Sequence, residues 1–492
     1  MRVETEASLS VQKPLGFLNG QAWKIRRIYG AWIGLLLADL LALELALLLG
    51  YATRTVLVEW MGLSNVALNM LLPLAMGLGL FPLGYLSAGL YPGYGLTPVE
   101  RMRRKIQVSF AVFFLLILWN WFFLRTGWSR GLMILTMGYA LVLVPLLSAM
   151  AQAIMMRFRL WGIPVLILGA ARTGALVARA LQREKALGLE PIGFLDDDPE
   201  KQGVRVAGIP VLGPLAEAGV FVRQGIQLGI LAMPGVGREQ LADFVQRLPF
   251  PRLILVPDLL DLPSLWVSTR DLGGILGLEI RRGLLLRRNR FIKRLIDYVV
   301  GIPLFLAALP LIGFWGLWIR IVSKGPVFYI QERIGYRGRT IRIFKLRTMY
   351  PDAEKRLTEY LAQNPEARSE WERYCKLKND PRVLPGIGRF LRRTSLDELP
   401  QLWNVLKGEM SLVGPRPFPR YHLEKFSVDF QQLRLSVLPG LTGLWQVTAR
   451  SDGDLQVQES LDTYYIRNWS IWLDLYILVR TIGVVWRGKG AY

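Results

Sequence analysis

The sequence contains almost none of two residue types that many active sites use. Its 492 residues include one cysteine, Cys375, and one histidine, His422. A single cysteine excludes an intramolecular disulfide, and because nothing around Cys375 indicates a reactive thiolate, we interpret it as structural. A single histidine excludes histidine-based zinc sites and histidine-activated nucleophiles, and His422 is expected at the protein surface. Any chemistry must therefore depend on carboxylates, Lys, Arg, Ser, Thr or Tyr.

Acidic residues are also scarce. The chain has 38 Asp and Glu against 60 Lys and Arg, a formal net charge of +22, which predicts an anionic partner. Nucleic acid, anionic lipid head groups and a diphosphate substrate all fit that charge. Hydrophobic residues make up 52% of the chain, which is too apolar for a purely soluble protein. A membrane protein is indicated, and this favours membrane lipids and a diphosphate substrate, with no nucleic acid.

Four apolar stretches are long enough to cross a bilayer, which takes roughly 20 residues. They cover about residues 29–51, 65–91, 107–124 and 131–155. Basic residues cluster before the first stretch, between the second and third, and after the fourth, so the positive-inside rule places the N-terminus and everything after Met155 in the cytoplasm. The first stretch is too long and starts too late for a cleavable signal peptide. We predict a domain of four transmembrane helices over residues 1–158.

A Rossmann-like α/β domain is predicted at residues 159–282. A buried strand from Pro164 leads into the turn Gly169-x-Ala-x-x-Gly174 and a helix, and a second strand from Ile192 ends at Asp196. Strands at 228–232 and 253–256, with a helix near 240–248, extend a parallel sheet. Gly169, Gly174 and Asp196 are candidates for binding a nucleotide, although this pattern alone is a weak signal.

The composition of this segment argues against a second active site. From Trp161 to Glu279 there is no Tyr, Cys or His, so the usual proton donor of a nucleotide-sugar reductase or epimerase is absent. A binding module, a regulatory module or a fold used for assembly is favoured.

A fifth apolar run, about residues 295–319, differs from the first four because basic residues precede and follow it. Both of its ends should therefore lie in the cytoplasm. Pro310 falls within the run, and proline removes a backbone hydrogen bond and bends a helix. A re-entrant helix satisfies both features; an ordinary fifth span with a proline kink is the alternative.

The segments that follow are short and mixed. Residues 327–348 alternate apolar and basic side chains around Gly335-Tyr-Arg-Gly338, which predicts a β-hairpin carrying several arginines, Arg333 among them. Residues 464–487 are rich in Trp, Tyr and Leu, which is typical of helices that lie in the membrane interface. Ordinary core packing would explain the same composition.

Two adjacent carboxylates stand at a predicted helix start in Ser395-Leu-Asp397-Glu398. Ser395 and Glu398 would also satisfy a capping box, which is the structural alternative to a site. The functional interpretation depends on the neighbours, since a helix N-terminus favours anions and nearby arginines donate to phosphoryl oxygens. Carboxylates without histidine also suit a hard ion such as Mg²⁺. Gly408 is the predicted end of this helix.

An ordered series of motifs extends over about residues 290–487. It comprises Ser323-Lys-Gly-Pro-Val-Phe328, Lys345-Leu-Arg-Thr-Met349, Leu396-Asp-Glu-Leu399, Gly414-Pro-Arg-Pro417, Pro439-Gly-Leu-Thr-Gly443 and Leu461-Asp-Thr-Tyr-Tyr465. The series resembles the signature of the bacterial sugar transferases, monotopic enzymes that move a sugar phosphate from a nucleotide diphosphosugar to a polyprenyl phosphate. The resemblance implies an α+β catalytic domain, placed here at residues 283–492.

The resemblance also implies roles for individual residues. Asp397 matches the nucleophile that forms a phosphosugar-enzyme intermediate with loss of UMP, and Glu398 matches the acid that helps to hold Mg²⁺. Arg416 matches an arginine at the diphosphate, and the polyprenyl phosphate would then attack the intermediate. Pro310 matches the break in the family's re-entrant helix, but Leu309 stands where relatives often carry Ser. Four further residues are candidates for substrate binding, although they could merely solvate their own elements: Lys345, Arg347, Arg392 and Gln446.

The expected activity follows from the order of the parts. Four spans, a Rossmann-like module and a transferase resemble the layout of enzymes that begin O-antigen, capsule or exopolysaccharide synthesis at the cytoplasmic face of the bacterial inner membrane. We expect transfer of hexose-1-phosphate from a UDP-hexose to undecaprenyl phosphate, with galactose favoured over glucose, by a homodimer. A membrane-bound NAD-dependent nucleotide-sugar enzyme and a non-catalytic lipid-binding scaffold are the alternatives.

Overall fold

The structure is a computed structural model, and it divides into two compact units, Met1–Asp261 and Leu262–Tyr492. Each unit is described on its own. The described residues are 21–61, 71–124, 129–233, 247–256, 267–271, 276–280, 287–364, 380–449 and 455–487, with single positions at 235, 244, 284, 368 and 377.

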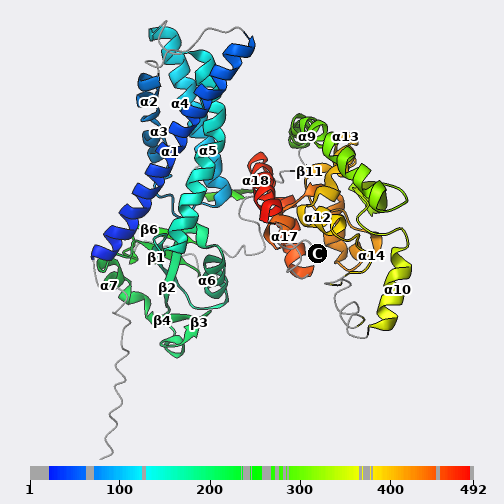
Figure 1. The fold of residues 1–492 in the computed structure, drawn as a ribbon. Coiled ribbons are helices and arrows are strands. Elements are labelled where there is room, and N and C mark those ends of the chain that lie inside the picture. Colours follow the sequence, from blue (N-terminus) through cyan, green and yellow to red (C-terminus); the bar gives the residue numbers. More distant parts are fainter. Residues whose placement is uncertain are drawn as a thin grey trace, which may run out of the picture. The chain divides into compact units, whose positions relative to one another are not determined.

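Long apolar helices form the first part of unit one (Figure 1). They are α1 (Gln21–Met61), α4 (Pro98–Trp119), extended by the π-helical turn η3 (Asn120–Leu124), and α5 (Arg130–Arg157). The side chains of Thr97 and Ser129 cap α4 and α5 by accepting the backbone N–H groups of Glu100 and Leu132. Within the described residues, these helices and α9 of unit two are the four that are long and apolar enough to cross a membrane.

The predicted single helix over residues 65–91 is wrong. The described part of this stretch contains two short helices, α2 (Leu71–Leu78) and α3 (Phe81–Ser87), which meet at Gly79 and Leu80. Pro82 lies in the first turn of α3, where its missing N–H is tolerated, and the glycine before it favours a turn. The stretch is apolar, as expected, but a break at Gly79 and Leu80 divides the helix in two.

A buried polar network joins the long helices of unit one. The Lys105 ammonium on α4 lies 2.5 Å from a carboxylate oxygen of Asp39 on α1, and it also donates to Ser148 on α5. Tyr91 donates its hydroxyl proton to the other Asp39 oxygen at 2.7 Å. Both charged side chains are 1% exposed or less, so the ion pair is enclosed by apolar helix faces.

The second part of unit one is the expected Rossmann-like sheet, with strand order β3-β4-β2-β1-β5-β6. The strands are β1 (Ile163–Leu168), β2 (Leu189–Leu195), β3 (Arg205–Val206), β4 (Ile209–Gly213), β5 (Leu228–Leu231) and β6 (Arg252–Leu255). All pairs are parallel except β3 with β4. Helices α6 (Arg172–Arg183) and α7 (Ala218–Arg223) accompany the sheet. Most of the helix predicted near 240–248 lies outside the described residues.

Specific contacts attach this sheet domain to the helices within unit one. Arg27 of α1 donates to Glu190 of β2 at 2.9 Å and to the carbonyl of Arg159 at 2.6 Å. Gln152 of α5 donates to the carbonyl of Ala186 at 2.8 Å. The contacts join groups far apart in the sequence, so the helices and the sheet form one body.

Unit two contains one long helix, α9 (Arg287–Val322), and a mixed α and β body. The predicted hairpin is confirmed as β9 (Phe328–Ile334) and β10 (Thr340–Leu346), which pair antiparallel. Short strands β11 (Ser411–Val413) and β12 (Gly440–Thr442) pair in parallel, and β7 (Val267–Asp271) and β8 (Leu276–Ile280) form a separate hairpin. The remaining helices are α10 (Ala353–Gln363), α12 (Ile387–Thr394), α13 (Leu402–Lys407), α14 (Arg420–Leu423), α15 (Val428–Leu435), α16 (Leu444–Thr448), α17 (Leu455–Arg467) and α18 (Ile471–Arg487).

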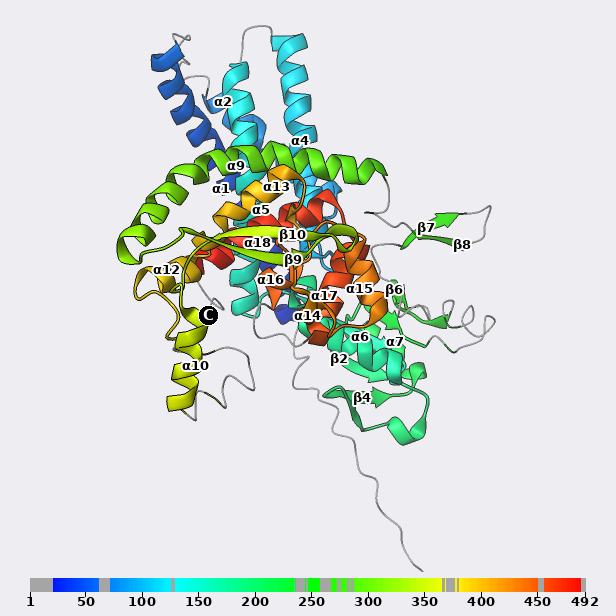
Figure 2. The ribbon, with the colours of Figure 1, turned by 90° about the vertical axis from the view of Figure 1, so that its right-hand side faces the viewer.

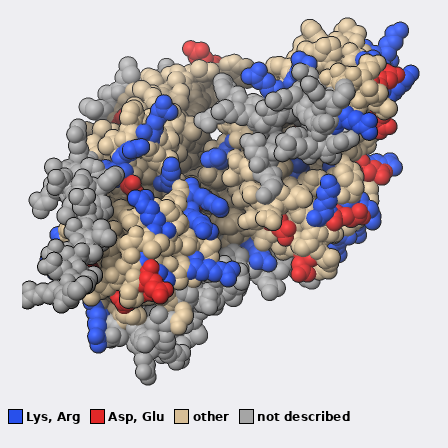
Figure 3. All heavy atoms as spheres, turned by 90° about the horizontal axis from the view of Figure 1, so that it is seen from below, with Lys and Arg blue, Asp and Glu red and all other residues tan. Residues whose placement is uncertain are grey.

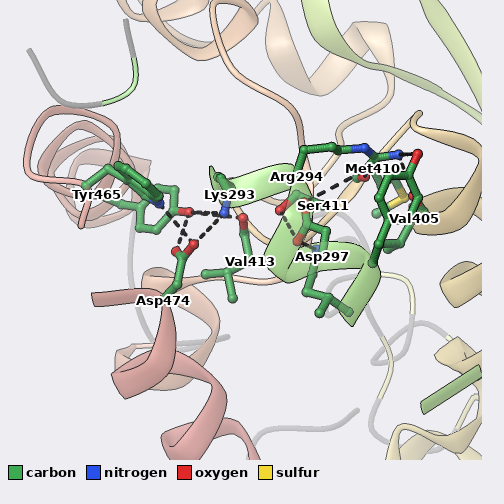
Figure 4. A network of polar contacts seen from close by, with 12 residues as sticks. Lys293, Arg294, Asp297, Val405, Met410, Ser411, Val413, Tyr465 and Asp474 are labelled. Atoms are coloured by element: carbon green, nitrogen blue, oxygen red, sulfur yellow. Dashed lines mark hydrogen bonds and ion pairs between the residues drawn. The ribbon is translucent and has the colours of Figure 1, made fainter. Parts of the chain in front are cut away.

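A network of polar contacts fastens the first turns of α9 to this body (Figure 4). Lys293 donates to Asp474 of α18 at 2.6 Å, and Tyr465 of α17 donates to the same carboxylate at 2.8 Å. One turn along α9, Asp297 accepts the hydroxyl of Ser411 and the backbone N–H of Leu412, each at 2.9 Å. These residues are buried, so the start of α9 is fixed by charge-assisted hydrogen bonds rather than by apolar packing alone.

The far end of α9 packs on the same body. Ile319 is fully buried against Leu346, Leu384, Ile387 and Leu391. Between the two ends, leucines at positions 304, 306, 309 and 311 are exposed. The helix is not interrupted at Pro310; it continues through both of its prolines and curves along its length (Figure 2).

Candidate active site

The adjacent acids lie on a short 3-10 helix, η10 (Leu396–Gln401), which leads directly into α13. Ser395, with a φ of 57°, ends α12 in the left-handed conformation and makes no side-chain capping bond. The capping-box alternative is therefore not realised, because the Glu398 carboxylate is bonded elsewhere. Gly408, with a φ of 91°, ends α13 as predicted.

Glu398 is held between two cations. Lys345 Nζ of β10 lies 2.7 Å from Glu398 Oε1, and Arg416 Nη2, from the loop after β11, lies 2.8 Å from the same oxygen. Burial alone would raise the pKa of Glu398, but the charges of Arg416 and Lys345 bring that pKa below its ordinary value. Glu398 in turn raises the pKa of Arg416. Glu398 and Arg416 are therefore both charged at neutral pH.

Asp397 is in a different environment although it is the next residue. It is 9% exposed, and among the described residues its carboxylate makes no hydrogen bond or ion pair. Burial, and then repulsion from Glu398, raises the pKa of Asp397 to about 6, against the opposing effect of Lys345, Arg392 and Arg416. Glu398 is thus held by two ion pairs and ionised, whereas the Asp397 carboxylate has no bonded partner among the described residues and has a raised pKa. This is the pattern expected of a nucleophile beside a supporting acid.

Arg392 of α12 stands on the Asp397 side of the site. Its Nε donates to the Thr348 hydroxyl at 2.9 Å, and its charge favours the ionised form of Asp397. Arg392, Lys345 and Arg416 therefore come from three separate elements and lie around the acid pair, and their role in substrate binding stays a prediction.

The structure places two other candidates differently. Arg347 is buried and donates to the backbone carbonyls of Ser323, at 2.6 Å, and Lys324, at 3.1 Å. A Cβ added at Gly325, which has a φ of 126°, would lie 2.2 Å from the Arg347 guanidinium, so that arginine and that glycine together shape the turn after α9. Gln446 of α16 donates to the carbonyl of Leu441 at 3.3 Å. Neither side chain contacts Asp397 or Glu398.

One basic residue of the site, Arg333 of β9, was not singled out by the sequence analysis. A small hollow is lined by Arg333, Ile343, Lys345, Gln401, Arg416, Pro417, Gly440 and Leu441. Two of these residues, Lys345 and Arg416, are the partners of Glu398. The hairpin pattern placed Arg333 on a strand, but only the register shows which face it occupies. The signal that could have found it is its even spacing from Gln331 and Tyr329, which puts these side chains on one face.

The donor set at the acids fits Mg²⁺. This ion prefers hard oxygen ligands and is commonly held by one or two carboxylates together with substrate phosphates. Asp397 and Glu398 supply two adjacent carboxylates, and among the described residues no cluster of three or more His, Cys, Asp or Glu offers an alternative all-protein site. Any metal here would therefore need ligands from the substrate as well.

The glycine turn of the Rossmann-like sheet is closed by the protein itself. Asp196 accepts the backbone N–H of Ala170 at 2.7 Å and that of Asp198 at 3.0 Å. A Cβ on Gly169 would lie 2.4 Å from the Met233 side chain, and one on Gly174 would lie 2.0 Å from the Gly169 carbonyl oxygen. Asp196, the candidate for a ribose hydroxyl, is thus bonded to backbone N–H groups. The close packing at Gly174 is the helix–strand contact typical of this turn.

Of the two rare residues, only His422 is among the described residues, and it packs among aromatic rings. Cys375 lies outside the described residues. His422 is only partly exposed, and its ring packs beside Phe418 and Phe426 at centroid distances of 4.3 and 5.8 Å. The expected surface position was therefore only half right, because this histidine packs in an aromatic cluster.

Two family profiles match the chain. The profile for bacterial sugar transferases matches residues 288–488, which include α9 and the whole acid site, and a profile described as a CoA-binding domain matches residues 87–249. The undecaprenyl-phosphate galactose phosphotransferase of Salmonella typhimurium is 36% identical over 78% of this chain and 80% of its own length. The chain belongs to the bacterial sugar transferase family. As a member of that family, it is a sugar-1-phosphate transferase.

Other members of the family act on related substrates. A UDP-galactose-lipid carrier transferase of Erwinia amylovora is 34% identical over 74% of this chain and 76% of its own length. A UDP-glucose:undecaprenyl-phosphate glucose-1-phosphate transferase of Xanthomonas campestris is 32% identical over 67% of each chain. Family members that use galactose and family members that use glucose are thus both similar to this chain over its two units.

Proposed function

We propose that this sugar-1-phosphate transferase moves hexose-1-phosphate from a UDP-hexose, with galactose favoured over glucose, to undecaprenyl phosphate. The observation that carries the proposal is the difference between the environments of Asp397 and Glu398. Glu398 is neutralised by Lys345 and Arg416, while Asp397 is buried beside them with its carboxylate uncommitted. The greater similarity to galactose-using relatives supports the choice of sugar.

In the first step the Asp397 carboxylate attacks the phosphorus that carries the hexose. An oxygen–phosphorus bond forms to Asp397, the bond from that phosphorus to the bridging oxygen breaks, and UMP leaves with the bonding electrons. Arg416 and Lys345 lie beside the reacting groups and stabilise the negative charge of the diphosphate and of the departing UMP. Arg392 favours the ionised state of Asp397 that attack requires.

In the second step an oxygen of undecaprenyl phosphate attacks the same phosphorus. The bond to Asp397 breaks, its carboxylate is restored, and undecaprenyl-diphosphate-hexose leaves. No proton transfer is needed in either step, because both nucleophiles are anions at neutral pH.

Glu398 and Asp397 are the residues that would hold Mg²⁺ when it is bound. The ion would supply charge neutralisation at the diphosphate oxygens, which makes phosphorus accessible to an anionic nucleophile.

We also propose that α9 enters and leaves the bilayer on the cytoplasmic face. The helix has 36 residues, so it is about 54 Å long and could span a membrane if straight. Its start and its end, however, both pack on the same folded body, through Lys293 and Asp297 at one end and Ile319 at the other. A spanning helix would separate these ends by the roughly 30 Å of the hydrocarbon core. The exposed middle of α9 is then the part that contacts lipid.

A re-entrant α9 would also place the catalytic unit relative to the membrane. The catalytic unit would lie at the cytoplasmic face of a bacterial inner membrane, with α17 and α18 close to the interface and with basic side chains available to anionic head groups. Figure 3 shows Lys and Arg side chains spread over one face of the described surface.

We propose that the enzyme is a homodimer and that it catalyses the first membrane step in O-antigen, capsule or exopolysaccharide synthesis.

The alternative of an NAD-dependent nucleotide-sugar enzyme has less support. Asp196 is bonded to backbone N–H groups, and the sheet segment lacks the expected tyrosine. A non-catalytic scaffold would give no reason for an uncommitted buried carboxylate beside a cationic cluster.

The test is a UMP-release assay with the full-length protein in nanodiscs, undecaprenyl phosphate and Mg²⁺. A panel of UDP-sugars is compared, and UDP-galactose is expected to give the highest kcat/KM. A preference for UDP-glucose would change the assigned sugar, and nicotinamide turnover without UMP release would favour the oxidoreductase.

A further inference from the structure

The β9–β10 hairpin presents two chemically different faces. Directly opposed residues of an antiparallel pair lie on the same face, and the register pairs Arg333 with Ile341, Gln331 with Ile343, and Tyr329 with Lys345. Arg333, Gln331 and Lys345 therefore form a polar row that ends at the acid pair. Arg342 pairs with Glu332 on the opposite face, where both side chains are well exposed.

Arg333 is an incompletely satisfied cation on the site face. Its Nη2 donates to Gln331 Oε1 at 2.6 Å, and among the described residues its buried Nε has no hydrogen-bond partner. The side chain is half-buried and lines the hollow that Lys345 and Arg416 also line. Its closest bonded partner is a neutral amide, whereas Lys345 and Arg416 share the Glu398 carboxylate.

The local charge balance is unfavourable without an anion. Burial and the nearby positive charge of Arg416 lower the pKa of Arg333, while Glu398 compensates only in part. A partly buried cation normally has a carboxylate or phosphate partner, and here the Glu398 carboxylate is already shared by Lys345 and Arg416. A guanidinium with free N–H groups suits phosphate oxygens, which it binds through two parallel hydrogen bonds.

We propose that Arg333 binds a phosphate group of a substrate in the hollow beside Arg416. The proposal rests on the proposed function, because two phosphate-bearing substrates then visit this site. The phosphate could belong to the diphosphate of the UDP-hexose or to undecaprenyl phosphate. The chemistry of recognition is the same for both, and the experiment distinguishes them.

The matched control is Arg342. It is on the same hairpin, carries the same charge and differs in facing away from the acids. Arg333→Gln and Arg342→Gln thus remove equal charge from the same hairpin, and Arg333→Lys keeps the charge but removes the forked donor. Thermal unfolding of each variant, compared with that of the wild type, shows whether the fold is retained.

The measurement is equilibrium binding, so that it does not depend on catalysis by Asp397. Full-length Asp397→Asn protein in phosphatidylethanolamine nanodiscs, with and without each arginine change, is titrated first with UDP and then with nanodisc-incorporated undecaprenyl phosphate. We expect Arg333→Gln to raise the Kd for one of these ligands about tenfold or more, Arg333→Lys to raise it less, and Arg342→Gln to change it less than twofold.

The Kd values for the two ligands decide whether Arg333 binds a phosphate and which substrate carries it. Weaker UDP binding assigns the phosphate to the donor, and weaker lipid binding assigns it to the acceptor. Unchanged Kd values for both ligands in folded Arg333→Gln protein would overturn the proposal, as would equal losses in Arg342→Gln protein. Failure of the proposed transferase reaction would appear instead as absent turnover by the enzyme with an intact Asp397.

Discussion

Asp397 and Glu398 show how neighbouring residues of similar chemistry acquire different roles. Their side chains are separated by one peptide bond, but Glu398 is fixed by two cations and Asp397 is enclosed without a bonded partner. Environment therefore moves the two pKa values in opposite directions. The acid with the raised pKa is the better nucleophile, and the acid with the lowered pKa keeps a permanent negative charge between Lys345 and Arg416.

The pH dependence of the first half-reaction tests this assignment. Asp397 attacks only when ionised, and its pKa is about 6, so the rate of UMP release without acceptor should fall as pH falls through about 6. Rapid-quench measurements between pH 5 and 8 would show the transition. Burial also raises the pKa of Asp462 to about 6, so Asp462→Asn is the control. Loss of the transition in that variant would move the titration away from Asp397.

At the residue scale the sequence could identify the acids but not every cation. Lys345 and Arg416 bond to Glu398, and the charge of Arg392 acts on Asp397, although these three cations are far apart in the sequence. Arg347 belongs to the same motif as Lys345, yet it points to the turn after α9. Strand register decides which neighbours share a face, and periodicity alone does not reveal which face meets the site.

At the scale of elements, α15 supports the loop that carries Arg416. Arg434 of α15 donates to the backbone carbonyl of Arg416, and its guanidinium lies 3.8 Å from the Phe418 ring centroid. Asp462 of α17 is 3.1 Å from the same guanidinium, and both side chains are buried. The two helices therefore position Arg416 through its backbone, without contacting the reacting groups.

Removing Arg434 should affect both stability and binding. Arg434→Met leaves Asp462 buried without a partner, which should cost about 3–5 kcal/mol in the free energy of unfolding. It also releases the Arg416 loop, so KM for the UDP-hexose should rise more than kcat falls. Unfolding experiments and steady-state kinetics measure the two effects.

The double variant Arg434→Met with Asp462→Leu separates these effects. Much of the lost stability should return, because no buried charge remains unpaired. The raised KM should persist, since the Arg416 carbonyl still lacks its donor. Recovery of KM together with stability would show that Arg434 is only a structural residue.

The ends of helices and strands were predictable where glycine marks them. Gly408 ends α13, and Gly335 to Gly338 turn the hairpin, as expected from their conformational freedom. The break between α2 and α3 was missed because a hydropathy pattern does not register a turn inside an apolar stretch. Likewise, prolines within α9 predicted a break, whereas the structure has a continuous curved helix.

At the scale of the molecule, the ion pair between Asp39 and Lys105 links two helices of the first unit. The residues are 66 positions apart, and Ser148 of a third helix joins them. Charges within membrane-spanning helices are unfavourable unless paired, so this network constrains how α1, α4 and α5 can assemble. Hydropathy predicted α1, α4 and α5 but could not predict this pairing.

A single substitution should therefore destabilise the helices of unit one. Lys105→Met should lower the free energy of unfolding by about 3–5 kcal/mol, because the Asp39 carboxylate would remain buried and unpaired. Thermal unfolding in detergent measures the loss, and Arg103→Met, which removes an exposed charge from the same helix, is the control. Lys105→Met combined with Asp39→Leu should restore much of the stability; equal loss in the single and double variants would contradict a paired charge.

The most direct test of the account is intact-protein mass spectrometry of enzyme quenched after incubation with UDP-galactose and Mg²⁺, without undecaprenyl phosphate. A mass increase of one hexose phosphate is predicted, mapped to Asp397 by peptide analysis, absent from Asp397→Asn and lost when undecaprenyl phosphate is added. Normal turnover with no adduct, or an adduct that persists in Asp397→Asn, would contradict the central claim.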